Sequence, residues 1–167
     1  ITLNTTTGGA TQSAGAITGS ALLLLGAGTF TLNSATNDVD SLAADLNTGD
    51  VLFTDTDGLN ITTVSSTSGI TTGGPGTGGQ VNIVSGGTIT VSQPVDTTLP
   101  NDATSTGALT LNGSIQINNT VTAGGGNISL TGSSSSTSDI VSNFALTSGG
   151  ALTLGAPRDV IINAAVQ

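Results

Sequence analysis

Short triplets in which a polar residue separates two branched apolar residues recur along the chain and predict β-strands. Three of them lie close together within residues 107–132, at 109–111, 115–117 and 128–130. In an extended strand, the two apolar side chains of a triplet point to one face and the polar side chain points to the other. The Asn, Gly, Ser and Thr residues between the triplets favour tight turns. Further triplets lie at 1–3, 30–32, 89–91 and 152–154.

The spacing of the triplets indicates a repeat. Leu109 lies 19 residues before Ile128 and 20 residues after Ile89. A repeat of about 20 residues that carries short strands is typical of a β-solenoid, in which each coil buries its apolar side chains against neighbouring coils. We therefore predict an all-β chain that forms a single-stranded parallel β-helix, with about 20 residues per coil and about eight coils. At about 4.8 Å per coil, the rod would be roughly 40 Å long.

Residues 1–167 form a single β-solenoid domain in this interpretation, either a whole protomer or one segment of a longer array. The polar residue of each triplet is predicted to point outward, so that stacking aligns these residues in a column on the surface. The predicted column is Thr31, Thr90, Thr110, Ser129 and Thr153.

Two segments fit the pattern less clearly. Residues 37–46 carry apolar residues at helical spacing, but Leu42, Ala44 and Leu46 also alternate as they would in a strand. Because strand patterns flank this segment on both sides, we favour a strand and a corner. Residues 21–25 are apolar on both faces and form either a buried strand or a contact surface for a neighbouring chain, of which we favour the buried strand.

Four segments rich in polar residues, glycine or proline are predicted to be turns or loops. Proline lacks a backbone N–H and is excluded from central strands, and glycine accepts the positive φ angles of sharp corners. The four predicted segments are 55–58, 73–79, 94–100 and 133–138.

The composition narrows the possible functions. The chain has 25 glycines, no cysteine and a net charge of −9, with Arg158 as its only basic residue. Binding to nucleic acid requires several Lys or Arg side chains, and docking on anionic lipid requires a basic surface, so we expect neither. No apolar run is long enough to insert across a bilayer. The absence of cysteine fits oxidising surroundings in which hydrogen-bonded coils hold the chain together.

The residue types present argue against an enzyme. The chain has no His, Cys, Lys, Glu or Tyr, so few groups remain that could act as an acid, a base or a nucleophile. Asp55 and Asp57 are the obvious carboxyl pair, but beside Gly58 they are expected to be solvated turn residues. The same two carboxylates are candidate ligands for Ca²⁺, because hard cations prefer oxygen ligands. Screening of the acidic surface by loosely held cations is the alternative.

Several segments resemble the repeats of large bacterial surface exoproteins of the filamentous-haemagglutinin-like type. The resemblance implies a right-handed parallel β-helix, export to the cell surface, and a role in adhesion, matrix or surface-layer structure. It carries over no catalytic residues. The segments that resemble a repeat unit are 37–39, 42–44, 53–59 and 70–72, and the simpler coils lie at 81–91, 107–130 and 150–166.

Three functions compete at this level. We favour a structural extracellular protein, a subunit or segment of a bacterial cell-surface fibre or layer that stacks head-to-tail with copies of itself or with the rest of a longer array. The shaft or binding module of a large secreted adhesin is the alternative. An ice-binding solenoid is not supported, because each triplet supplies one Thr where a two-file ice face would need two. Residues expected at the stacking ends are Ile1, Leu3, Leu22, Leu24, Val160, Ile162 and Val166.

Overall fold

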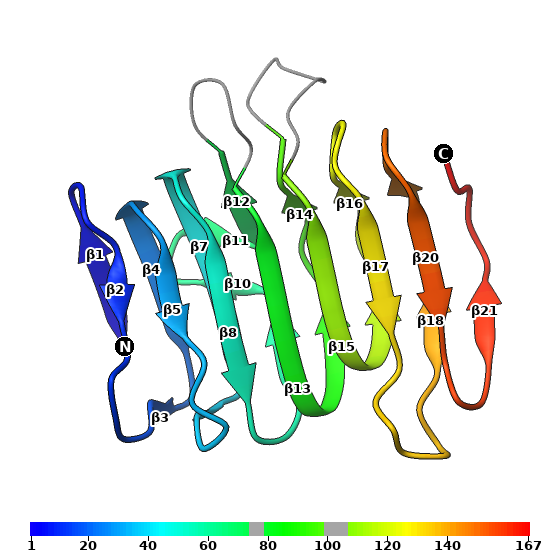
Figure 1. Ribbon diagram of the computed structural model, residues 1–167, viewed down its shortest axis with the longest axis horizontal. Helices are drawn as coiled ribbons and strands as arrows, with labels where there is room; N and C mark the ends of the chain where they lie inside the picture. The colour runs from blue at the N-terminus through cyan, green and yellow to red at the C-terminus, as the bar shows by residue number, and fades with distance from the viewer. Residues whose placement is uncertain (74–78, 99–106) are drawn as a thin grey trace.

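The computed structural model of the chain describes residues 1–73, 79–98 and 107–167. In these residues the protein is all-β, without helix, and forms a β-solenoid of about 6 turns with ~24 residues per turn. Figure 1 shows the coils stacked side by side along the long axis, with the two termini at opposite ends. The strands of successive coils pair in parallel and form three stacks, each running along the rod.

The first stack begins at the amino terminus. It contains β1 (Thr2–Thr5), β4 (Leu22–Ala27), β7 (Ser41–Thr48), β12 (Ile70–Thr72), β14 (Val95–Asp96), β16 (Val121–Thr122) and β19 (Leu146–Thr147). The second stack contains β2 (Ala10–Thr11), β5 (Phe30–Leu32), β8 (Val51–Asp55), the first halves of β13 (Val81–Val91) and β15 (Leu109–Ile117), β17 (Ile128–Thr131) and β20 (Leu152–Gly155).

The third stack uses the second halves of the two long strands. It contains β9 (Leu59–Ile61), the second halves of β13 and β15, β18 (Ile140–Ser142) and β21 (Val160–Ile162). Two small pairs lie outside the stacks, the parallel pair β3 (Thr18–Gly19) with β6 (Asp38–Val39) and the antiparallel hairpin β10 (Thr63–Val64) with β11 (Thr67–Ser68).

The β-solenoid class is confirmed, but the predicted eight coils of about 20 residues are wrong. Leu109 stacks on Val81 and not on Ile89, which instead pairs with Ile115. The triplets at 109–111 and 115–117 are therefore two halves of one strand within one coil. Because the later coils carry two triplets each, counting triplets overestimated the number of coils. With about 6 turns at about 4.8 Å each, the rod is about 30 Å long.

The predicted outward column of Thr and Ser is also corrected by the register. Thr90 belongs to the third stack, where it lies between Asn60 and Gln116. The outward column of the second stack runs through Thr31, Leu52, Asn82, Thr110, Ser129 and Thr153. Leu52 and Asn82 interrupt the hydroxyl side chains, so this face has no continuous file of threonines.

The core is the set of apolar side chains that point into the coils. Phe30 and Phe53 are its largest members, and both are almost completely buried. The segment 37–46 is a strand and a corner, as favoured from the sequence, with β6 and β7 on either side of Asp40. The strand favoured for 21–25 is confirmed as β4, in which Leu23 is only 5 % exposed although it faces away from its neighbours in the core.

An inserted hairpin interrupts the third coil. Ile61 of β9 stacks on Leu42 and Ile70 of β12 stacks on Ala44, so that both strands lie on β7. Between them, residues 62–69 leave the coil as the β10–β11 hairpin, whose base closes with a 3.0 Å hydrogen bond from the Gly69 N–H to the Thr62 carbonyl. The hairpin lies against β7, and its insertion accounts for part of the unusual length of this coil.

The later coils share a three-residue corner between the third and first stacks. Asn118, Asn143 and Asn163 occupy the first position of successive corners. The side-chain amide of Asn143 donates to Oδ1 of Asn118 at 2.9 Å, and that of Asn163 donates to Oδ1 of Asn143 at 2.8 Å. This asparagine ladder ties the corners of three successive coils together.

The predicted loops have mixed outcomes. The segment 133–138 is a loop between β17 and β18, as predicted. The segment 94–100 was predicted as a loop, but Val95 and Asp96 form β14, and 99–100 lie outside the described residues. Residues 74–78 of the predicted loop 73–79 also lie outside the described residues, and the Thr72 hydroxyl donates to the Gly79 carbonyl at 2.8 Å beside them.

Candidate functional site

A recess on the side of the rod follows from unequal corner lengths between the second and third stacks. In β15, two residues, 113–114, separate Asn112 from Ile115. In the following coil, their partners Thr131 and Ile140 are separated by the eight residues 132–139. A short corner therefore lies beside a long one, and the long loop stands out beyond it.

The corner on the other side of β15 is also longer. Val84 and Thr88 of β13 pair with Asn112 and Ser114, so three residues of β13 oppose Gly113 alone. The backbone of β13 lies close to the coil below here, because a Cβ on Gly86 would lie 2.1 Å from the Thr56 carbonyl oxygen. Only glycine fits this position, and the corner of β15 is recessed between its two neighbours.

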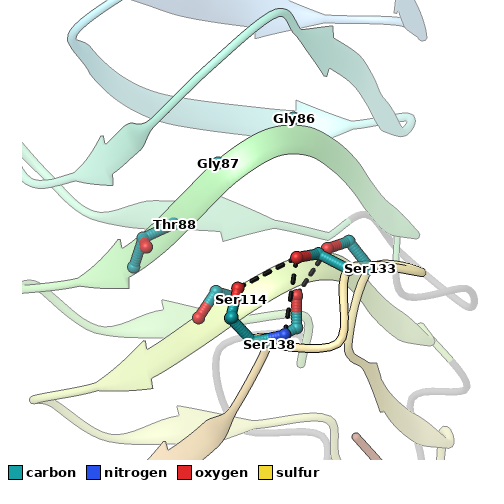
Figure 2. A pocket seen from close by; sticks show the side chains of 8 residues that line it. Gly86, Gly87, Thr88, Ser114, Ser133 and Ser138 are labelled. Atoms are coloured by element: carbon teal, nitrogen blue, oxygen red, sulfur yellow. Dashed lines mark hydrogen bonds between the residues drawn. The ribbon is translucent and has the colours of Figure 1, made fainter. Parts of the chain in front are cut away.

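The recess is a pocket of ≈ 220 Å³ lined only by hydroxyl side chains and glycine. Figure 2 shows Ser114 of β15 between Thr88 of β13 and the serines of the 132–139 loop. The side chains that line it carry neither charge nor an aromatic ring. The lining residues are Gly86, Gly87, Thr88, Ser114, Ser133, Ser135, Thr137 and Ser138.

Hydrogen bonds within the 132–139 loop hold its hydroxyl groups in place. Ser133 and Ser138 share a hydrogen bond of 2.5 Å between their hydroxyl oxygens, and Ser135 and Thr137 share one of 2.9 Å. The backbone N–H of Ser138 donates to the Ser135 carbonyl at 3.0 Å. The loop is thus organised by its own polar groups, without an apolar core of its own.

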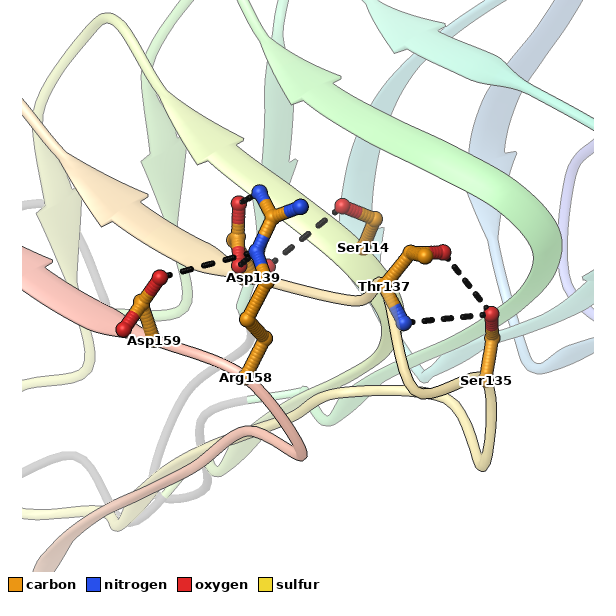
Figure 3. Close-up of polar contacts among 6 residues, drawn as sticks. All are labelled: Ser114, Ser135, Thr137, Asp139, Arg158 and Asp159. Atoms are coloured by element: carbon orange, nitrogen blue, oxygen red, sulfur yellow. Dashed lines mark hydrogen bonds and ion pairs between the residues drawn. The ribbon is translucent and has the colours of Figure 1, made fainter.

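An ion-pair cluster lies beside the pocket, as Figure 3 shows. Arg158 donates through Nε to one oxygen of Asp139 at 2.7 Å and through a terminal nitrogen to the other, and its Nε lies 3.5 Å from Asp159. The hydrogen bond and the charge of Asp139 raise the pKa of the exposed Arg158 guanidinium. The Ser114 hydroxyl makes a long contact of 3.5 Å with the Asp139 carbonyl, which connects the pocket to this cluster.

The candidate calcium ligands Asp55 and Asp57 lie close together but in different environments. Asp55 is buried at the end of β8 and accepts backbone N–H groups from Val39 at 3.0 Å and from Asp57 at 3.3 Å. Asp57 is exposed. Burial raises the pKa of the Asp55 carboxyl, the two N–H donors oppose this shift, and the nearby carboxylates of Asp57 and Asp38 add to it. A calcium ion at this pair stays a prediction.

Elsewhere in the described part of the chain, no group of three or more acidic side chains is placed to hold a metal ion. Asp50, which belongs to the same acid-rich third, instead links neighbouring coils. Its carboxylate accepts the Gln80 N–H at 2.7 Å and the Thr29 hydroxyl at 3.3 Å.

The residues expected at stacking ends fall into two groups. Ile1, Val160, Ile162 and Val166 are exposed by 37 to 55 %, and Leu3 is partly buried. Leu22 and Leu24 are fully buried between β1 and β7, so they lie inside the coil stack and not on an end surface.

Sequence reasoning missed the pocket and the asparagine ladder. The ladder had a visible signal, because Asn118, Asn143 and Asn163 each follow a strand triplet directly. The pocket had none, since it depends on which corners are neighbours, and the register of the coils determines that.

The fold defines this chain as a β-solenoid repeat protein. In comparisons with protein-family models, curated proteins and solved structures, no match to the chain was found. None of the described segments forms a helix of the length and apolar character needed to cross a membrane.

Proposed function

We propose that the chain is a structural segment of a bacterial cell-surface fibre or layer, in which the β-solenoid continues by stacking of end coils. The occupant of the end surface is either another copy of the chain or the next coil of a longer array. The resemblance of its segments to surface exoprotein repeats and the scarcity of reactive side chains support this role.

The observation that carries the proposal is the composition of the last coil. Val160 and Ile162 stack on Ile140 and Ser142, which are both fully buried, so they occupy inward positions of the coil. They are nevertheless 42 % and 37 % exposed, as their outward neighbour Ile161 is. Large apolar side chains grouped on a surface mark interaction sites. The edge of β21 also presents backbone groups to which a further strand can add.

Negative-stain electron microscopy over a concentration series tests this assembly. We expect unbranched fibres whose axial repeat is about 30 Å, one rod of about 6 turns at about 4.8 Å per coil. Val160→Asp should disperse the fibres, because it places a charge in the stacking surface, where burial without a partner is costly.

Ile161→Asp is the matched control, since this side chain lies on the same strand but points outward. It should leave the fibres intact. Short rods at every concentration of the unaltered chain would contradict self-stacking, as would fibres that persist in Val160→Asp.

The shaft or binding module of a secreted adhesin is the second candidate. The pocket beside β15 favours it, because a purely structural coil has no need of a hydroxyl-lined recess. The exposed β10–β11 hairpin is a further projection from an otherwise regular rod.

A further inference from the structure

We propose that the pocket between β13, β15 and the 132–139 loop binds one neutral sugar unit of a glycan. The pocket lies on the side of the rod, so this proposal stands independently of assembly through the ends. It is argued from the shape of the recess, the chemistry of its lining and the hydrogen-bonding capacity of its hydroxyl groups.

The lining excludes charged ligands. A carboxylate or phosphate would need a free cation, but the Arg158 beside the pocket already donates to both oxygens of Asp139. A bound cation would need carboxylate ligands, and the side chains that line the pocket are all hydroxyls. An apolar ligand would desolvate these hydroxyl groups without replacing their hydrogen bonds with water. The remaining class is a neutral ligand that both donates and accepts hydrogen bonds.

The hydroxyl groups keep unused hydrogen-bonding capacity. Each hydroxyl has one hydrogen to donate and two lone pairs. In the pair Ser133 and Ser138, and again in the pair Ser135 and Thr137, one hydroxyl donates and the other keeps its hydrogen. Across the pocket, the Ser114 hydroxyl has only the long 3.5 Å contact with the Asp139 carbonyl. The two walls can therefore donate to and accept from the hydroxyl groups of a sugar.

The size of the pocket limits the ligand to a single unit. At ≈ 220 Å³ it is smaller than the ~300–1,000 Å³ typical of pockets for drug-sized ligands. Its open side allows the rest of a glycan to extend into solvent along the rod. Without an aromatic platform, binding rests on hydrogen bonds that replace those with water, so we expect a dissociation constant of about 1–10 mM for one sugar unit.

The test is a titration of the isotope-labelled chain followed by amide chemical shifts in NMR. The probes are glucose, galactose, mannose and N-acetylglucosamine, each raised to about 100 mM so that a site in the expected range approaches saturation. We expect at least one sugar to give saturable shifts that are concentrated at residues 86–88, 114 and 133–138. Ser114→Ala should weaken this binding about fivefold, the effect of losing one hydrogen bond.

Ser129→Ala is the matched control, because Ser129 is an outward serine in the second stack, outside the pocket. It should leave the affinity unchanged, and thermal unfolding should show that both variants remain folded. The absence of saturable shifts with all four sugars would overturn the proposal. So would shifts that are spread over the whole rod, or a Ser114→Ala variant that binds as tightly as the unaltered chain.

Discussion

At the scale of single residues, polar side chains buried at corners join successive coils. Asn37 is completely buried and exchanges two hydrogen bonds with Gln12 of the preceding coil, at 2.7 and 3.1 Å. Its amide also donates to the carbonyls of Leu32 and Thr54, and its oxygen accepts the Ile17 N–H. A buried amide with all its partners fixes one arrangement of the chain, because every alternative leaves polar groups unpaired.

Asp55 occupies a comparable corner, but with a group that titrates. Burial raises the pKa of its carboxyl above the ordinary value of 3.8. The protonated form is therefore favoured in the folded state, and its contribution to stability is fully present below pH 3.8. That contribution is lost as the pH rises through the raised pKa of the folded state.

We predict that the unaltered chain gains stability relative to Asp55→Asn as the pH is lowered from 7 toward 4. The free energy of unfolding in urea, measured for both proteins over this range, checks the prediction. Asp45→Asn, at an exposed residue of β7, serves as the control for the general loss of negative charge on acidification. A difference between the chain and Asp55→Asn that shrinks or reverses on acidification would contradict the assigned direction.

At the scale of elements, corners of different length give each coil its shape. The strand β7 runs from the third stack into the first without a corner, whereas the later coils turn there through three residues such as 92–94 and 118–120. The β10–β11 hairpin lies in the coil between these two arrangements. It is an insertion whose two ends meet, so its length is not required by the strands on either side.

We predict that deletion of residues 64–68 leaves the solenoid folded. Thr62, Thr63 and Gly69 would then form a three-residue corner that matches 92–94 in the next coil. Shortening an exposed loop changes the closure entropy only slightly, so the free energy of unfolding should fall by no more than about 2 kcal/mol. Circular dichroism and thermal unfolding provide the measurement.

Deletion of the five residues 81–85 is the matched control for the hairpin deletion. It removes the first half of β13, which pairs with β8 on one side and β15 on the other, and should abolish the cooperative transition. If the two deletions were equally damaging, the hairpin would be part of the folding unit and not an insertion.

At the scale of the whole molecule, stability depends on how many neighbours a coil has. Leu111, Leu130 and Leu154 are stacked in one column, but Leu111 is fully buried and Leu154, in the last strand of the second stack, is only partly buried. In a repeat protein, interfaces between neighbouring coils supply much of the stability. The end coil has a described neighbour on one side only.

We predict that Leu111→Ala costs about 2–5 kcal/mol, and that Leu154→Ala costs less than half as much in dilute solution. Urea unfolding of the two variants measures the difference. Under conditions where fibres form, the cost of Leu154→Ala should approach that of Leu111→Ala, because stacking buries the end coil. Equal costs in dilute solution would show that the end is already covered.

The sequence by itself determined the fold class and the strands. Triplets such as 109–111 and 128–130 alternate with a period of two, and an apolar pair on one face of a strand has to be buried against similar pairs. The same alternation identified β7 within the ambiguous segment 37–46. These conclusions depend only on local geometry and on the hydrophobic effect, which act on any chain with this pattern.

Only the tertiary structure decided the register of the coils and the pocket. The triplets at 89–91 and 109–111 look alike, and both fit a repeat of about 20 residues, but they belong to different stacks. Register follows from the lengths of corners and insertions, such as 62–69 and 132–139, whose polar residues carry no periodic signal. The recess at Ser114 exists because a short corner lies between two longer ones, and that neighbourhood is set when the coils stack.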